Sequence, residues 1–315
     1  MATDRSQRQL RPGSSIDGAV LDHVAHAVPR WQDAWTRYAV DLGARWKSGG
    51  AGVGFSPAQL SFGNGARLEL LMPGNVEDDD FLARFLDRHG PGPHHLTFKV
   101  PDLDVALAAA TAAGYSPIGI DRSEPGWQEA FLSPREATGV VVQLAQAAHE
   151  WVNDPPPDFP AGARTGSDGT PLPAAHLELV VHAVARLAEG LDLFAGLLGG
   201  TEARSGEEDG VAWAELRWGG PLGLRLVAPA DSDPAPVLRT WLGDRSGRVH
   251  HLQLAVAEPA GVTGAQPSTL LPVLVAPPGP PREPSPAHGT APSEPLEVRP
   301  ADNEGLRLVL RPGAG

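Results

Sequence analysis

The sequence predicts an α+β fold made of four units of β-α-β-β-β order that form two tandem domains with curved mixed sheets. A short pattern returns four times along the chain, an alternating strand with a histidine near its start. The aligned histidines are His23, His95, His176 and His251, which gives steps of 72, 81 and 75 residues. A repeat of this length is typical of a supersecondary unit, so the repeat predicts the architecture.

The first unit contains the clearest local signal, because Gly63-Asn64-Gly65 stands between two alternating runs and predicts a hairpin. The elements expected in this unit are a strand over 17–28, a helix over 31–42, a mobile Gly-rich loop over 47–57, hairpin strands over 59–62 and 66–72, and a connecting helix over 77–89.

The second unit repeats this order, and the third repeats it in part. The expected elements are strand 94–100, helix 103–113 and strands 116–121, 127–132 and 139–145, then strand 175–182, helix 184–198 and strands 211–218 and 222–228. The fourth unit begins at Arg248 and ends in strand 305–311. It has no predicted helix, because Glu258-Pro259-Ala260-Gly261 breaks helices.

Composition divides the chain into four parts. Residues 1–15 are expected to be a disordered tail, 16–147 an N-terminal domain, 148–172 a Pro-rich linker and 173–315 a C-terminal domain. A second Pro-rich run, 277–295, is expected to be a solvent-exposed loop.

The charge balance and the hydropathy pattern exclude several classes of protein. The net charge of −13, spread along the chain, argues against a nucleic-acid partner. No apolar run reaches 18 residues, which argues against a membrane span. The N-terminus has no apolar signal segment, so a cytoplasmic location is expected. We expect a small-molecule substrate, and a homodimer is compatible with the linker length.

Strand alternation places the candidate ligands on one face. His23 shares a face with two alanines, and His95 shares one with Thr97 and Lys99; this face is expected to be open and concave. His26 and His94 fall on the opposite face, which packs on the helices, so a structural role is expected for them.

In each of the first two units, the last strand has one polar residue between apolar ones. Glu69 follows His23 by 46 residues, and Gln143 follows His95 by 48. Paired units would bring these four side chains to one point. Two imidazoles, a carboxylate and an amide oxygen suit one divalent transition metal ion, such as Zn, Ni, Co, Mn or Fe.

The motifs resemble those of the vicinal oxygen chelate superfamily, which includes glyoxalase I, methylmalonyl-CoA epimerase, bleomycin-resistance proteins and extradiol dioxygenases. They are Leu21-Asp22-His23-Val24, His94-His95-Leu96-Thr97-Phe98, Leu68-Glu69-Leu70-Leu71-Met72-Pro73, Ala130-Phe131-Leu132-Ser133-Pro134 and Gly139-Val140-Val141-Val142-Gln143-Leu144. Residues 17–146 resemble this superfamily well and residues 173–312 resemble it weakly. Within the superfamily, the resemblance is closest to the methylmalonyl-CoA epimerases.

The resemblance implies two tandem glyoxalase-like domains and a metal held by His23, Glu69, His95 and Gln143. Epimerase-like members usually carry Glu where this chain has Gln143, and an additional acid for proton transfer. No acid lies between Asp41 and Glu69 in this chain. Glu69 and Glu129 are therefore the candidate catalytic carboxylates.

Arg67, Thr97 and Lys99 are candidates for binding an anionic substrate group, because they lie on the same predicted face. The second half is expected to be a degenerate copy. Arg225 takes the place of Glu69 there, and Val309 takes the place of Gln143, so its role would be structural or to cover substrate.

Three functions stay open on these observations. The first is a metal-dependent isomerase or lyase acting on a small carbonyl or acyl-CoA substrate through a metal-stabilised enolate or oxyanion. The second is a metal-free drug-binding or resistance protein. The third is an iron-dependent oxygenase that uses His23, His95 and Glu69 as a two-histidine, one-carboxylate set.

Overall fold

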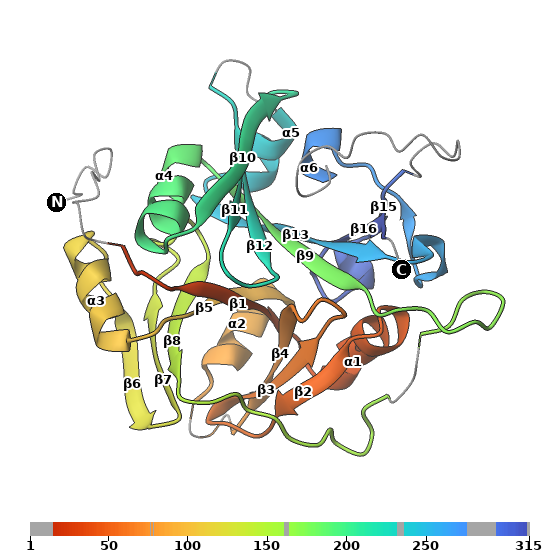
Figure 1. Ribbon diagram of the computed structural model, residues 1–315, viewed down its shortest axis with the longest axis horizontal. Helices are drawn as coiled ribbons and strands as arrows, with labels where there is room; N and C mark the ends of the chain where they lie inside the picture. The colour runs from red at the N-terminus through yellow and green to blue at the C-terminus, as the bar shows by residue number, and fades with distance from the viewer. Residues whose placement is uncertain are drawn as a thin grey trace. The chain divides into compact units, whose positions relative to one another are not determined.

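The computed structural model describes residues 15–75, 77, 79–160, 164–231, 236–275 and 294–313. One eight-stranded mixed sheet is formed by the first half of the chain. Its strands are β1 (Val20–Ala27), β2 (Arg45–Gly49), β3 (Gly54–Ser61), β4 (Arg67–Gly74), β5 (Gly92–Lys99), β6 (Ile118–Glu124), β7 (Trp127–Leu132) and β8 (Val141–Ala147). The order across the sheet is β2-β3-β4-β1-β5-β8-β7-β6, which places β1 and β5 side by side (Figure 1).

The second half of the chain forms another eight-stranded sheet with the equivalent order, β10-β11-β12-β9-β13-β16-β15-β14. Its strands are β9 (His176–Val184), β10 (Thr201–Glu208), β11 (Val211–Arg217), β12 (Gly223–Pro229), β13 (Gly247–Val256), β14 (Gln266–Pro267), β15 (Leu296–Val298) and β16 (Leu308–Pro312). The predicted α+β fold with two tandem mixed sheets is therefore confirmed.

The helical elements are α1 (Trp31–Trp35) continued by the π-helix η1 (Thr36–Asp41), α2 (Phe81–His89), α3 (Leu103–Ala112), α4 (Leu187–Leu191) continued by η2 (Asp192–Leu197), α5 (Pro236–Leu242), α6 (Pro272–Val275) and the 3-10 turns η3 (Pro259–Gly261) and η4 (Pro300–Asp302). In the first three repeats a helix follows the first strand: α1 follows β1, α3 follows β5 and α4 follows β9. Residues 257–265 are all described and hold only η3, so the loss of the helix in the fourth unit is confirmed.

The predicted hairpin is present and longer than expected. Strands β3 and β4 pair from Ser61↔Arg67 out to Gly54↔Gly74, and Gly65 has a positive φ of 82° in the turn. A left-handed residue in a short connection favours glycine, which explains the strength of the Asn-Gly signal.

The prediction of a mobile loop over 47–57 is wrong. Its first part belongs to β2, and β3 begins at Gly54. Gly49 serves close packing there, because a Cβ at this position would meet the Trp46 ring at 2.5 Å. The register of β2 against β3 also shifts between Trp46 and Ser48, which breaks the alternation used to recognise strands.

Packing divides the chain into two compact units, and each unit draws on both halves of the sequence. The units are Met1–Asp22 with His95–Glu150 and His182–Val249, and His23–His94 with Trp151–Val181 and His250–Gly315. The predicted domains, 16–147 and 173–315, correspond to the two sheets. That each of them folds as a separate unit stays a prediction.

Two predicted irregular segments lie almost entirely outside the described residues, namely the tail over 1–15 and the Pro-rich run over 277–295. The linker over 148–172 is described except at 161–163. Within it, Asn153 accepts hydrogen bonds from Trp46 Nε1 and Gly49 N and donates to Gly49 O. In the described ranges, every helix is too short or too polar to cross a bilayer.

Candidate metal centre

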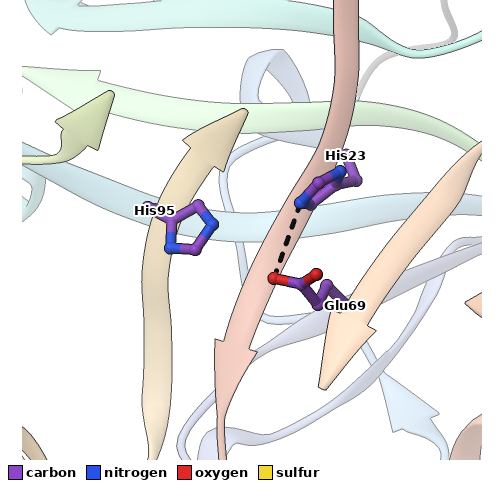
Figure 2. Close-up of side chains that lie close together, drawn as sticks. All are labelled: His23, Glu69 and His95. Carbon is purple, nitrogen blue, oxygen red and sulfur yellow. Dashed lines mark ion pairs between the residues drawn. The ribbon is translucent and has the colours of Figure 1, made fainter. Parts of the chain in front are cut away.

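Three of the four predicted metal ligands come together on neighbouring strands. His23 lies on β1, Glu69 on β4 and His95 on β5, and β1 stands between the other two strands in the sheet. Figure 2 shows the two imidazoles and the carboxylate turned toward one another. One ligand atom from each side chain lies within 4.8 Å of the others.

The register explains how residues so far apart in the sequence meet. Strands β1 and β4 are parallel, and Ala25 is paired with Glu69. Strands β5 and β8 are also parallel, and Thr97 is paired with Gln143. In both units the oxygen-bearing side chain therefore stands beside the residue that follows the histidine by two, so the two offsets have one structural origin.

The donor atoms of the cluster are largely removed from solvent. His23 is 1% exposed, His95 5% and Glu69 9%. The Nε2 atom of His23 lies 3.6 Å from Oε2 of Glu69, and the other carboxylate oxygen accepts a 3.4 Å hydrogen bond from Gln59 Nε2. Burial of a carboxylate beside two imidazoles is costly unless a cation or hydrogen bonds compensate for the lost water.

The prediction that this face of the sheet is open is wrong for the part of β1 that follows His23. Ala25 and Ala27 are fully buried and belong to a cluster with Leu71 and Leu82. Leu82 is on α2, so the connecting helix covers this face. The small alanines leave room for the helix, and they do not leave an open cup.

Gln143, the fourth predicted ligand, is buried and firmly oriented. Thr97 Oγ1 donates to its Oε1 at 2.5 Å, and its Nε2 donates to Glu129 Oε2 at 2.7 Å. An amide oxygen has two lone pairs, so the bond from Thr97 leaves Gln143 chemically able to coordinate an ion. Its role as a ligand stays a prediction.

Glu129, a predicted catalytic carboxylate, joins the same network. Its Oε2 atom accepts from Gln143 and also from Trp127 Nε1, at 2.6 Å. Two donors on one oxygen fix the direction of the carboxylate. Trp127 is thus a partner that orients Glu129.

The three residues proposed from sequence to bind a substrate anion have different surroundings. Thr97 is fully buried and donates to Gln143. Lys99 Nζ lies 3.2 Å from Asp22 Oδ1 and 3.3 Å from Glu150 Oε1, so two carboxylates already hold its charge. Arg67 is half-buried on β4 and is paired in register with His23, a member of the cluster.

His26 and His94 have the structural surroundings expected of them. His26 Nδ1 lies 3.0 Å from the Tyr38 hydroxyl, its Nε2 lies 2.7 Å from the Glu304 carbonyl oxygen, and burial lowers its pKa to about 4. His94 packs against Phe85 with ring centroids 4.7 Å apart, and burial lowers its pKa to about 4 as well, opposed by the nearby Glu69 charge.

Sequence reasoning missed Gln59, which donates to Glu69. The signal was present, because the hairpin turn is centred on Asn64 and pairs Gln59 with Glu69. Residues at equal distances from a hairpin turn face each other, so the pairing followed from the turn alone.

The described residues of the second half do not form an equivalent cluster. In the part of the chain that the structure describes, His23, Glu69 and His95 form the single group of three or more His, Asp or Glu that could hold an ion. His176 is exposed, and Arg225 is fully buried beside Glu215, with 2.9 Å between Nη2 and Oε2. The loss of the metal site in this half stays a prediction.

Solved structures with similar folds include methylmalonyl-CoA epimerases. The chain is 28% identical to that of Mycobacterium tuberculosis, over 45% of this chain and 95% of the epimerase, with a TM-score of 0.38. It is 26% identical to a hypothetical protein of Bacillus halodurans C-125, over 44% of this chain and all of that one, with a TM-score of 0.39. A Streptomyces coelicolor epimerase in complex with 2-nitronate-propionyl-CoA is 22% identical, over 41% and 98% of the two chains, with a TM-score of 0.36.

No curated protein matches the chain. A family model matches residues 22–131, which include His23, Glu69, His95 and Glu129 and end before Gln143. The model describes the superfamily that the sequence motifs indicated. Over residues 22–131 the chain is therefore similar to the Glyoxalase/Bleomycin resistance protein/Dioxygenase superfamily.

Proposed function

We propose that this protein is a metal-dependent enzyme of the glyoxalase and epimerase type, acting on a small carbonyl or acyl-CoA substrate. The cluster of His23, Glu69 and His95 carries the proposal. Its donor set of two imidazoles and one carboxylate is characteristic of catalytic transition-metal sites, which leave positions open for water or substrate. The family match over 22–131 supports the same chemistry.

The spacing of the donors fits one ion. Nitrogen and oxygen ligands bind zinc at about 2.0–2.2 Å, so donors of one ion are at most about 4.4 Å apart. The three donor atoms lie within 4.8 Å of one another, and His23 Nε2 and Glu69 Oε2 are 3.6 Å apart. Small side-chain adjustments would complete the site, and Gln143 would add an amide oxygen.

When bound, the ion would act as a Lewis acid that stabilises negative charge developing on a substrate oxygen. The protein's own residues would hold the ion and move the proton. Glu129 is the proposed proton acceptor, because Trp127 and Gln143 hold its carboxylate in one direction. Glu69 is the alternative acceptor, and Gln59 would then retain its carboxylate near the substrate.

One observation favours a second function. Two histidines and one carboxylate on one side of an ion are the ligands of non-haem iron oxygenases. His23, His95 and Glu69 have this composition. An iron(II)-dependent oxygenase is therefore the second candidate, and its diagnostic is oxygen consumption that requires iron(II).

Metal analysis of the purified protein tests the proposal. We expect about one equivalent of a divalent transition metal, lost in His23→Ala, His95→Ala and Glu69→Ala. His176→Ala is the matched control, because this exposed strand histidine lies in the other sheet. Metal-free protein whose affinity for a small ligand survives chelation would instead indicate a binding or resistance protein.

The reaction class is tested by proton exchange. Metal-loaded enzyme in deuterated water should exchange the acidic α-proton of a carbonyl or acyl-CoA substrate, followed by NMR. Glu129→Gln should slow the exchange by about 100-fold or more, as expected when a general base is removed, without loss of bound metal. Loss of metal in this variant would show that Glu129 acts as a ligand and not as the proton acceptor.

A further inference from the structure

A series of hydrogen bonds crosses three neighbouring strands beside the candidate metal centre. It starts at Thr97 on β5, passes through Gln143 on β8 and ends at Glu129 on β7, and these strands are adjacent in the order β5-β8-β7. Thr97 follows the candidate ligand His95 by two residues on β5, so both residues belong to one face of the sheet. The network of Thr97, Gln143 and Glu129 therefore begins beside a candidate ligand and ends at the proposed proton acceptor.

The strand register brings the three side chains of this network together. Thr97 and Gln143 are paired directly on the parallel strands β5 and β8. On the antiparallel strands β7 and β8, Glu129 is paired with Ala145, which follows Gln143 by two residues. Glu129 and Gln143 are therefore diagonal neighbours on one face of the sheet, a separation that long side chains can bridge. The small side chain of Ala145, directly opposite Glu129, leaves room for the amide of Gln143 to reach the carboxylate.

The donors and acceptors of the network fit together in one direction. An ionised carboxylate accepts hydrogen bonds and cannot donate them, so the amide nitrogen of Gln143 faces Glu129, with 2.7 Å between Nε2 and Oε2. The amide oxygen then faces Thr97, whose hydroxyl donates to it at 2.5 Å. Thr97 is fully buried and Gln143 is 7% exposed. Removal of the Thr97 hydroxyl would therefore take a donor from a buried amide oxygen and loosen the hold on the whole amide group.

The equivalent strands of the second sheet are paired without such a network. Strands β13 and β16 correspond to β5 and β8, and their parallel pairing places Gln253 opposite Val309, where the first sheet has Thr97 opposite Gln143. Val309 is fully buried, and its side chain has no donor or acceptor. The same strand pairing is thus made with an apolar residue on the last strand. Strand pairing alone therefore does not explain why the sheet with the candidate metal cluster has Gln143 at this position.

We propose that Thr97 is a positioning residue for proton transfer. It holds the amide of Gln143, which in turn holds the carboxylate of Glu129. Trp127 Nε1 donates to the same carboxylate oxygen, Oε2, at 2.6 Å, so the direction of the carboxylate is set from two sides. A small misplacement of a reacting group slows a reaction strongly, so the hold on Glu129 matters for rate. The proposal rests on the proposed function, in which Glu129 accepts the proton, and it replaces the expected role of Thr97 in binding a substrate anion.

Hydrogen exchange of the Gln143 side-chain amide tests the positioning without any substrate. The full-length protein is labelled with ¹⁵N, and the amide signal is assigned by its loss in Gln143→Met. Thr97→Val keeps the shape of the side chain and removes the hydroxyl, so these amide protons should exchange with solvent at least about fivefold faster, which equals about 1 kcal/mol, the usual contribution of one hydrogen bond. Thr97→Ser keeps the hydroxyl and should retain slow exchange. Thr111→Val is the matched control, because Thr111 is an exposed threonine whose hydroxyl donates to the Leu107 carbonyl.

Proton exchange in deuterated water tests the role in the reaction. The probes are propionyl-CoA, an acyl-CoA, and hydroxyacetone, a small carbonyl compound. With the probe that the wild type deprotonates, Thr97→Val should lower kcat at least about tenfold and keep KM within about twofold, because the base is misdirected while the contacts to substrate remain. Bound metal should stay the same, and Thr97→Ser should recover most of kcat. A raised KM with unchanged kcat would overturn the proposal and assign Thr97 to substrate binding.

A double-mutant cycle separates positioning from a general loss of stability. Trp127→Phe removes the second donor to Glu129, and Thr97 and Trp127 lie on strands that β8 separates. If both residues act on one carboxylate, the fall in kcat in the double variant should differ by at least about threefold from the product of the two single effects. Effects that simply multiply would contradict a shared action on Glu129.

The two measurements distinguish failure of the positioning role from failure of the proposed function. If the wild type exchanges neither probe, the proposed function fails for these substrates, and the role in proton transfer fails with it; the amide exchange still shows whether Thr97 holds Gln143. If the wild type exchanges a probe and Thr97→Val keeps both slow amide exchange and kcat, the positioning role alone is overturned. A loss of kcat that Thr97→Ser does not recover would overturn it as well.

Discussion

Protonation of His26 should destabilise the protein as the pH falls, and the hydrogen bonds of this side chain show why. The Glu304 carbonyl can only accept, so His26 Nε2 carries the proton and donates to it. His26 Nδ1 then accepts from the Tyr38 hydroxyl, which itself accepts from Asn303 Nδ2 at 3.2 Å. A proton added at Nδ1 would face the hydroxyl proton of Tyr38, so the network has no place for a charged imidazole.

The magnitude follows from the pKa difference between the unfolded and folded states. Burial lowers the pKa of His26 from 6.5 to about 4, so between these values the unfolded chain binds a proton that the folded chain does not. The contribution of neutral His26 to the free energy of unfolding is therefore fully present above pH 6.5, and it is lost as the pH falls toward 4. From pH 7 to pH 5 the loss is about 2 kcal/mol, at about 1.4 kcal/mol per pH unit below 6.5.

His182 adds a similar contribution. It is fully buried, donates through Nε2 to the Thr138 carbonyl at 2.9 Å, and has its pKa lowered by burial to about 4. The wild type should therefore lose about 4 kcal/mol between pH 7 and pH 5 from the two histidines together. Typical domains are stable by about 5–15 kcal/mol, so the effect is large enough to measure.

Urea unfolding at pH 7 and pH 5 measures the effect. His26→Gln keeps a neutral donor for Glu304 and cannot be protonated, so it should lose about 2 kcal/mol less than the wild type over this pH interval. His176→Gln, at an exposed strand position, is the control and should behave like the wild type. An equal pH dependence in His26→Gln and the wild type would refute the reasoning.

Three further changes have defined outcomes. Gly139→Ala should prevent folding or destabilise the protein far beyond the about 1–2 kcal/mol of left-handed strain, because its Cβ would lie 1.8 Å from the Gly247 carbonyl oxygen; Gly65→Ala has the same φ of 82° and open space, and urea unfolding should show the strain alone. Leu82→Ala should cost about 2–5 kcal/mol in the same measurement, as for other fully buried leucines. Asn153→Ala removes three hydrogen bonds to β2 and should speed limited proteolysis of the linker with little change in global stability.

The strands and the register were predictable where alternation was uninterrupted. The hairpin from β3 to β4 followed from Asn64-Gly65. Glycines with positive φ follow the helices, at Gly43, Gly90, Gly114 and Gly199. The strands β2 and β10 were not predicted from the sequence. Both are edge strands with register shifts and many polar or glycine residues. Such strands are stabilised by pairing with their neighbours, and their own composition does not reveal them.

The candidate site was predictable in its residues and only partly in its surroundings. Similar spacings from histidine to oxygen ligand indicated Glu69 and Gln143, and the parallel pairings of β1 with β4 and β5 with β8 are their physical basis. The helix α2 over Ala25 was not predictable, because sequence alternation gives the face of a strand and does not give the element that covers it.

The comparison of the two sheets shows that the fold alone does not decide the chemistry of this position. Glu69 and Arg225 have the same place in equivalent hairpins. A carboxylate there can join two histidines around a cation, whereas a permanently charged guanidinium repels a cation. In the second sheet Arg225 lies over the ring of Trp213, which a Cβ at Gly206 would approach to 3.2 Å. The same backbone position thus carries an anionic side chain in one sheet and a cationic side chain in the other.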